Sequence, residues 1–229
     1  MLNQKTSLPI VIVFALLQAL IHYTGHQHFA TLLSFVTILF LAVLLFSKTR
    51  LKGRFHKRMF IGLLLTAAGF AYFYFVPRYT EIKSSLFFYV LPQLYFLNAF
   101  YLDFKSAPAL DKTGARIAIA TAFCFSISYY MLMRGDLGML RLPFMIGLFC
   151  SSFLYMMACF RNQRVNKESF NLMLTGVVIL VVAEAFFAYH AFKAPIINGD
   201  LTYQILSMMA YTVIVLGSIE RKLIHPEGT

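Results

Sequence analysis

Apolar windows of about twenty residues recur along almost the whole chain, with short charged segments between them. A helix needs roughly 20 mostly apolar residues to cross a bilayer. Eight transmembrane helices are predicted on this basis, at 8–24, 28–47, 59–77, 85–104, 115–133, 142–160, 169–192 and 202–220. The chain is therefore predicted to be an all-α integral membrane protein.

The composition agrees with a membrane location. Apolar residues make up 60% of the 229 residues and charged residues only 13%, whereas soluble domains are about half apolar. The windows are solidly apolar, while the strands of a membrane β-barrel alternate between apolar and polar residues. Because the connecting segments are short, residues 1–229 are predicted to form a single transmembrane domain.

The net charge of +11 raises the alternative of a nucleic-acid partner, which the positions of the charges disfavour. With a cytoplasmic N-terminus, 15 of the 20 basic residues fall in cytoplasmic segments and five outside, at Arg78, Lys83, Arg134, Arg141 and Lys193. This bias follows the positive-inside rule. It predicts a multi-pass plasma-membrane protein with both termini in the cytoplasm and no nucleic-acid partner. The basic segment "KTRLKGRFHKR" is either such a topology signal or a contact for anionic lipid head groups.

Two predicted helices can be laid over each other: "GLLLTAAGFAYFYF" from Gly62 and "GVVILVVAEAFFAY" from Gly176. Both cross the membrane in the same sense, and they stand four helices apart. The chain is thus a candidate for two four-helix halves related by a parallel repeat. The alternative is chance similarity, because apolar helices align easily with one another.

Glu184 is the only acidic residue well inside a predicted helix. An ionisable side chain at bilayer depth costs at least ~2.5 kcal/mol and usually faces a cavity or a partner. Other polar side chains come to similar depth, and they are Gln18, His22, Gln93, Gln204 and Tyr211. Together they predict a polar pocket that opens to the outer half of the membrane. The alternative is a structural hydrogen bond between helices, with Glu184 protonated.

Other residue types give no further site. His22, His26 and His28 have no cysteine or carboxylate beside them, so they are interpreted as interfacial polar residues and no metal or cofactor is predicted. Ser151 and Ser152 lack the company of a histidine and an aspartate, and they are interpreted as packing residues.

The second half of the chain resembles the YhhN-like, or lysoplasmalogenase, family of eight-helix membrane proteins. The resemblance is carried by "RLPFMIGLFCSSFLYMMACF", "GVVILVVAEAFFAYHAFKAPI" and "QILSMMAYTVIVLG". Ala183 and Glu184 stand where that family has Ser-Asp, and Met209 and Tyr211 match its last helix. The first half departs further, since Phe70 stands where an aspartate belongs and Gln93 where a histidine is usual.

Membership of this family implies hydrolysis of the vinyl-ether bond of a lysophospholipid within an intramembrane pocket. Such a bond is cleaved by protonating its β-carbon, after which water captures the oxocarbenium ion. A carboxyl group held away from water can supply the proton. Glu184 is the candidate catalytic acid and base, and Gln18, His22, Gln93, Gln204 and Tyr211 are candidates for binding the lipid.

Phe70 keeps other functions open, because a phenyl ring neither transfers a proton nor orders a water molecule. The same pocket could bind or transport an amphipathic lipid or small molecule without cleaving it. Alternatively, Glu184 only joins helices in a structural membrane protein.

Overall fold

The computed structural model describes residues 27–76, 82–106 and 111–224, together with a few positions between 13 and 21. The described helices are α2 (Gln27–Thr49), α3 (Gly53–Phe75), α4 (Ile82–Lys105), α5 (Lys112–Met133), α6 (Arg141–Cys159), α7 (Lys167–Phe192) and α8 (Gly199–Ile219). A short 3₁₀ turn, η1 (Gly138–Leu140), precedes α6. The predicted helix at 8–24 lies almost wholly outside the described residues. The described chain is all-α, as predicted.

Six of these helices are long and apolar enough to cross a membrane, and α4 is the exception within the described residues. Helix α4 contains Pro92 and the polar residues Gln93, Asn98 and Asp103, which lower its hydropathy. The six spans identify a multi-pass helical membrane protein. They are fewer than the eight predicted.

The predicted boundaries agree with the structure to within a few residues, with one larger difference. Helix α3 begins at Gly53, six residues before the predicted start at 59. Its first turns carry Arg54, Lys57 and Arg58. A helix can continue beyond the hydrocarbon layer, so hydropathy locates the membrane-facing part of a helix and not its end.

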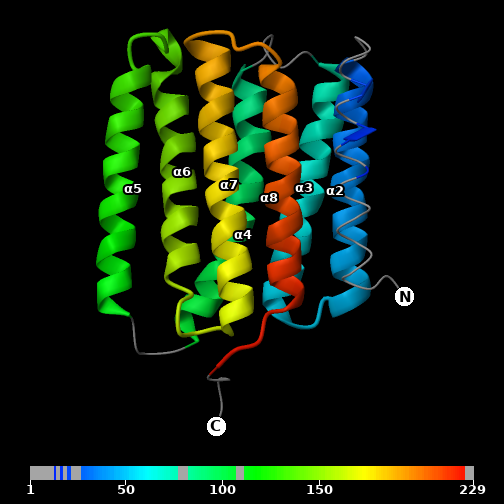
Figure 1. Cartoon of the computed structure of the whole chain (residues 1–229), viewed down its shortest axis with the longest axis vertical. Coiled ribbons are helices and arrows are strands. Elements are labelled where there is room, and N and C mark those ends of the chain that lie inside the picture. The colour runs from blue at the N-terminus through cyan, green and yellow to red at the C-terminus, as the bar shows by residue number, and fades with distance from the viewer. Residues whose placement is uncertain are drawn as a thin grey trace.

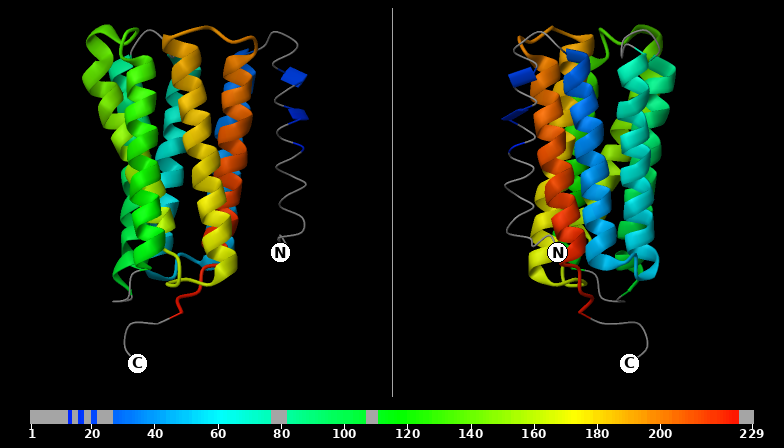
Figure 2. Two further views of the ribbon diagram at one scale, coloured as in Figure 1. Left: turned by 60° about the vertical axis from the view of Figure 1, so that its left-hand side comes forward. Right: turned by 90° about the vertical axis from the view of Figure 1, so that its right-hand side faces the viewer.

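The helices run alternately up and down along the long axis of the bundle (Figure 1). Six of them form a closed ring in which neighbours pack in the order α2, α3, α4, α6, α7, α8 and back to α2. Helix α5 stands outside this ring and packs against α6, at the edge of the bundle (Figure 2). The ring surrounds an interior that side chains fill differently in its two halves.

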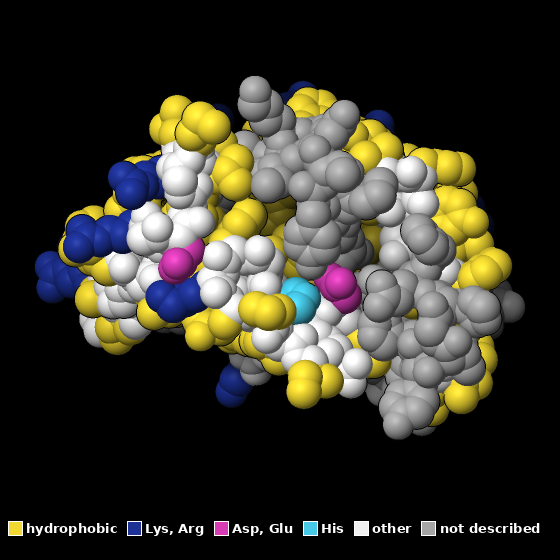
Figure 3. Space-filling model, turned by 90° about the horizontal axis from the view of Figure 1, so that it is seen from above, with side chains coloured by type: hydrophobic (Ala, Val, Ile, Leu, Met, Phe, Trp, Pro, Cys, Tyr) yellow, Lys and Arg dark blue, Asp and Glu magenta, His cyan; other side chains and the backbone are white. Residues whose placement is uncertain are grey.

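The alternation brings the connecting segments between α2 and α3, α4 and α5, and α6 and α7 to the lower end of the bundle (Figure 1). Together with the helix ends that flank them, these segments carry 12 of the 20 basic residues, at Lys48, Arg50, Lys52, Arg54, Lys57, Arg58, Lys105, Lys112, Arg116, Arg161, Arg164 and Lys167. Among the described residues seen from above, most side chains are apolar or uncharged, basic ones gather toward one edge, and acidic ones lie nearer the middle (Figure 3). The charge bias in the sequence is therefore a bias between the two ends of the folded bundle.

Glycines allow close approach between helices of the ring. A Cβ atom on Gly62 of α3 would overlap the ring of Phe96 on α4. A Cβ atom on Gly176 of α7 would lie 2.7 Å from the Ile214 side chain and 2.9 Å from the Ile214 backbone nitrogen on α8. Small residues at these points let backbones pack closely, as is usual in membrane proteins.

The lower half of the interior contains a buried ion cluster. The Asp103 carboxylate accepts hydrogen bonds from Arg161 Nε at 2.7 Å and Arg221 Nε at 2.7 Å. Asp103 and Arg161 are completely buried. The Arg161 guanidinium also lies 5.1 Å from the centre of the Phe100 ring. The cluster joins α4, the segment after α6 and the segment after α8.

Candidate functional site

A cavity of about 190 Å³ lies in the upper half of the bundle. Helices α3 to α8 all contribute to its walls. The cavity extends from Thr66 and Ser151 in the middle of their helices to Leu140 and Phe192 near the upper end of the bundle. The cavity lies toward the end of the bundle opposite the connecting segments of α2 with α3 and of α6 with α7 (Figure 1).

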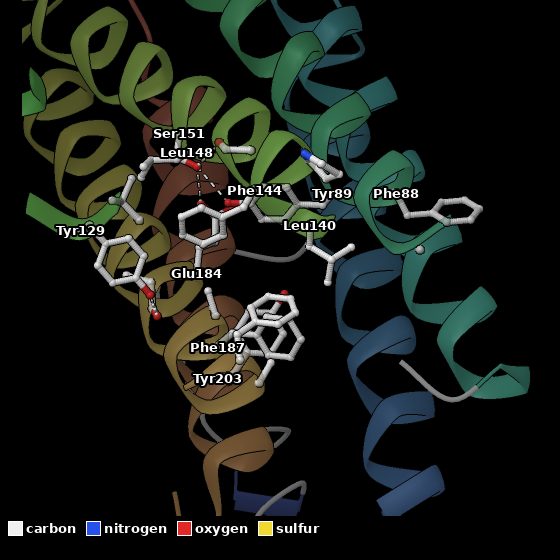
Figure 4. A pocket seen from close by; sticks show the side chains of 18 of the residues that line it. Phe88, Tyr89, Tyr129, Leu140, Phe144, Leu148, Ser151, Glu184, Phe187 and Tyr203 are labelled. Carbon is white, nitrogen blue, oxygen red and sulfur yellow. Dashed lines mark hydrogen bonds between the residues drawn. The ribbon is translucent and has the colours of Figure 1, made fainter. Parts of the chain in front are cut away.

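Aromatic side chains dominate the walls. They account for 11 of the 23 lining residues, namely Phe70, Phe73, Phe88, Tyr89, Phe125, Tyr129, Phe144, Phe187, Phe192, Tyr203 and Tyr211, although aromatic residues make up only 17% of the chain. Several are packed together: the ring centres of Phe187 and Tyr203 are 4.7 Å apart, and those of Tyr129 and Phe144 are 5.8 Å apart. The side chains are arranged around a common space (Figure 4).

Glu184 lies in this wall and is 8% exposed. Gln93 Nε2 on α4 donates a hydrogen bond to Glu184 Oε1 at 2.6 Å, and Ser151 Oγ on α6 lies 2.9 Å from Glu184 Oε2. The Tyr89 hydroxyl lies 2.9 Å from Ser151 Oγ. Dashed lines in Figure 4 mark the bonds that join Ser151 to its neighbours. Neutral side chains of two helices, α4 and α6, therefore hold the carboxyl group that α7 carries.

Ser151 can support both protonation states of Glu184. Its hydroxyl lies 2.9 Å from Glu184 Oε2, 2.9 Å from Tyr89 Oη and 3.0 Å from the carbonyl oxygen of Gly147. A serine hydroxyl has one proton to donate and can accept two. It can donate to a Glu184 carboxylate, or it can donate to Gly147 and accept a hydrogen bond from a Glu184 carboxylic acid. The hydrogen bonds around Ser151 are thus compatible with both protonation states of Glu184.

Two of the predicted site residues lie beside Glu184. Gln93 bonds to it directly, and its Oε1 atom has no hydrogen-bond partner among the described residues. Tyr211 lines the cavity from α8. Gln204 is buried on the same helix but does not belong to the described lining. Gln18 and His22 lie outside the described residues, so the structure does not place them.

Phe70 lines the cavity from α3 and is 6% exposed. It stands eight residues after Gly62, as Glu184 stands eight residues after Gly176. Aligning α3 with α7 at these glycines pairs Phe70 with Glu184. Both residues line the same cavity. Glu184 is its only acidic residue among the described lining, and no lysine, arginine or histidine belongs to that lining.

Sequence reasoning missed Tyr89 and assigned Ser151 to packing. Ser151 is buried on α6 and bonds to the carboxyl group of α7, so the interpretation as a packing residue is wrong. One signal was present: Tyr89 and Gln93 are four residues apart and share a face of α4. Nothing in the linear sequence brings Ser151 to within a hydrogen bond of Glu184, 33 positions away.

Searches with family models, against curated proteins and against solved structures found no match to this chain. The resemblance to the lysoplasmalogenase family rests on the sequence motifs quoted above. Within the described residues, no group of three histidine, cysteine, aspartate or glutamate side chains could hold a metal ion. What the site can do chemically depends on one carboxyl group in an aromatic cavity.

Proposed function

We propose that this protein is a lysoplasmalogenase-like membrane hydrolase, which cleaves the vinyl-ether bond of a lysophospholipid inside the cavity. The activity is supported by one feature: Glu184 lies in the wall of an apolar, aromatic cavity in the upper half of the bundle. The motifs around Glu184 and in the last helix add the resemblance to that family. The walls suit an alkenyl chain, because they are largely hydrocarbon.

Glu184 acts as both acid and base in this reaction. Its carboxylic acid gives a proton to the β-carbon of the alkenyl chain, and the electron pair of the double bond forms the new C–H bond. The α-carbon and the ether oxygen then share the positive charge of an oxocarbenium ion. The Glu184 carboxylate takes a proton from water as the water oxygen bonds to the α-carbon. The resulting hemiacetal breaks into a fatty aldehyde and a glycerophospho-alcohol.

The surroundings of Glu184 favour these steps. Gln93 and Ser151 hold the two carboxyl oxygens, which fixes the direction in which the proton leaves. Ser151 accommodates the carboxyl group with and without its proton, as the reaction requires. The aromatic walls and the carboxylate stabilise a positive charge that develops between them.

A second candidate function is binding of an amphipathic lipid without cleavage, or its transport. Phe70 favours it, because an apolar ring lines the cavity where the resembled family carries a second acid. A phenyl ring cannot hold a water molecule for attack on the oxocarbenium ion. In this case Glu184 orients the polar end of the ligand.

The finer features of the membrane topology are proposals as well. We place both termini in the cytoplasm of a plasma-membrane protein with eight spans, following the charge bias between the two ends of the bundle. Two related four-helix halves are supported by Gly62 and Gly176, which allow close packing of α3 on α4 and of α7 on α8. Phe70 and Glu184 are then equivalent positions of the two halves.

The hydrolase is tested by release of fatty aldehyde from a 1-alkenyl lysophospholipid by purified protein in detergent. Glu184→Gln removes the acid and keeps the shape, so we expect turnover to fall about 100-fold or more. Glu168→Gln is the matched control, since Glu168 is an exposed residue in the first turn of the same helix. Equal turnover of Glu184→Gln and wild type overturns the role of Glu184. No turnover by folded wild-type protein overturns the hydrolase and leaves the binding protein.

A further inference from the structure

Helix α5 lines part of the cavity although it stands outside the ring of six helices. Phe125 and Tyr129 of α5 belong to the described lining, while the helix packs against α6 at the edge of the bundle (Figure 1). An interior space can reach a helix outside the ring only through the wall between two ring helices. The cavity therefore passes through that wall, and α5 covers the opening.

The opening lies between α6 and α7, where small residues line it. Ala185, Ala188 and Ala191 follow one another at intervals of three along α7, so they share a face of the helix, and all three line the cavity. Gly147 lines it from α6. Short side chains on these two helices leave space that the longer side chains of α5 can enter.

Tyr129 closes the opening. Its hydroxyl donates a hydrogen bond to the carbonyl oxygen of Ala185 on α7, and its ring centre lies 5.8 Å from that of Phe144 on α6. The Phe125 ring, one turn earlier on α5, stacks against Tyr129 with ring centres 5.6 Å apart. Two aromatic rings and one hydrogen bond therefore cover the opening.

The surface around this cover is exposed on both helices. Leu132, three residues after Tyr129 on α5, is 46% exposed, and Val182, three residues before Ala185 on α7, is 54% exposed. Phe125 lines the cavity and is itself 37% exposed. Apolar side chains on the surface of a membrane-spanning bundle face lipid chains, which are as apolar as leucine. A single layer of α5 side chains thus lies between the cavity and the bilayer.

We propose that the opening between α6 and α7 is a lateral portal, through which the hydrocarbon chain of a bilayer amphiphile enters the cavity, and that Tyr129 is its latch. This inference uses the cavity of the proposed function and names the route of its ligand. Alanine, glycine and aromatic rings around the opening suit a hydrocarbon chain. Release of one hydrogen bond and rotation of two rings open the portal, while the Ala185 carbonyl keeps its bond within helix α7.

A second contact holds the upper end of α5 in place during this movement. Lys193, directly after α7, donates a hydrogen bond to the Leu132 carbonyl oxygen at 2.8 Å and pairs with Asp136 at 3.4 Å. These bonds lie at the helix ends, above Tyr129. The latch can therefore open without separating α5 from the bundle.

The experiment uses a hexadecanol that carries a diazirine near the end of its chain, dissolved in the bilayer of nanodiscs that contain the full-length protein. After a short incubation and photolysis, mass spectrometry measures the label on Leu148 and Ala188, which line the cavity. Phe149 is the reference for contact with bilayer lipid, since it is 64% exposed and outside the described lining. We expect label on all three residues of wild-type protein. Label on Phe149 alone overturns the portal.

Tyr129→Phe keeps the ring and removes the latch. We expect label on Leu148 and Ala188 to rise about fivefold, the factor that corresponds to one hydrogen bond, with label on Phe149 unchanged. Tyr130→Phe is the matched control, because Tyr130 is the neighbouring tyrosine of α5 and lies outside the described lining. Equal label in the cavities of folded Tyr129→Phe, Tyr130→Phe and wild-type protein overturns the latch and the portal.

Entry from the upper end of the bundle is the competing route. Leu140 lines the cavity near that end, so Leu140→Ala would increase label in the cavity if the chain entered there. We expect no increase. A rise with Leu140→Ala and none with Tyr129→Phe overturns the lateral portal in favour of the upper route.

The outcome is separable from that of the hydrolase assay, because hexadecanol has no vinyl-ether bond. Latch-dependent label without aldehyde release supports the portal and overturns the hydrolase. Aldehyde release with label that does not depend on Tyr129 overturns the portal and supports the hydrolase.

Discussion

Ser151 shows how one hydroxyl can determine the behaviour of a buried acid. Its neighbours are the Glu184 carboxyl group, the Tyr89 hydroxyl and the carbonyl oxygen of Gly147. Ser152, next in the chain and also buried, instead contacts Ser126 on α5 at 2.5 Å. The adjacent residues Ser151 and Ser152 therefore bond to different neighbours, and of the two only Ser151 belongs to the described lining of the cavity.

Ser151→Ala is expected to destabilise the protein more than Ser152→Ala. The first substitution leaves Glu184 Oε2 and the Tyr89 hydroxyl without their shared partner, and an unsatisfied buried polar group costs about 1–3 kcal/mol. After Ser152→Ala, Ser126 still donates to the carbonyl oxygen of Ala122. The free energies of unfolding, measured by denaturant titration in mixed micelles, compare the two variants.

A double-mutant cycle assigns the effect to the Glu184 contact. In a Glu184→Gln background, Ser151→Ala should cost a different free energy than in wild type, because residues that share a hydrogen-bond network are not additive. Additive effects of the two substitutions, or equal costs for Ser151→Ala and Ser152→Ala, would contradict the proposed coupling.

At the scale of helices, the ends of α4, α6 and α8 are fastened together by the ion cluster at the lower end of the bundle. Asp103 is the single acidic residue of α4, while Arg161 and Arg221 follow α6 and α8. Backbone hydrogen bonds add to this connection, from Asn166 to the Lys222 carbonyl at 2.9 Å and from Ile224 to the Arg164 carbonyl at 3.0 Å. The cluster thus joins three helix ends at the lower end of the bundle, while the cavity lies in the upper half.

Asp103→Ala is expected to lower the free energy of unfolding by about 3–5 kcal/mol, because it leaves Arg161 buried without a counter-charge. The matched control is Asp136→Ala. Asp136 pairs with Lys193 at 3.4 Å in an exposed position, and exposed pairs contribute about 0–1 kcal/mol. Unfolding in mixed micelles gives both values, and similar losses for the two variants would argue against a buried, structural Asp103.

At the scale of the whole molecule, the alternation of helix directions decides which segments share a side of the membrane. Segments before α3, α5 and α7 lie at one end of the bundle, and those before α4, α6 and α8 at the other (Figure 1). On the positive-inside rule, we propose that the lower end is cytoplasmic. In this orientation the cavity, which extends toward the upper end, faces the outer half of the membrane.

This topology is tested by labelling single cysteines on intact cells with a membrane-impermeant maleimide, after replacement of Cys124, Cys150 and Cys159 by alanine. We expect Ile197→Cys to react, since Ile197 is 91% exposed at the upper end. Lys167→Cys, at the start of α7, should react only after the membrane is permeabilised. The reverse pattern would invert the proposed orientation.

The sequence by itself determined the class of the fold and the place of its acid. Runs of apolar residues locate helices because the bilayer offers the backbone no hydrogen-bond partner. Hydropathy alone therefore predicted α2 and α5 to α8 nearly at their observed limits. The unequal distribution of basic residues between alternate connecting segments predicted that the two ends of the bundle differ in charge. Glu184 was identifiable because an acid in an apolar helix is costly and therefore conspicuous.

Only the tertiary structure decided which residues meet Glu184. Hydropathy indicates which residues belong to a membrane helix but not which helices are neighbours. It therefore could not predict that Ser151 and Tyr89 lie next to each other, or that Gln204 lies outside the described lining. It also missed the burial of Asp103 with Arg161 and Arg221, since charges near helix ends are indistinguishable in sequence from charges in loops. Contacts between distant helices depend on how the ring closes, and Gly62 and Gly176 allow two of its pairs, α3 with α4 and α7 with α8, to pack closely.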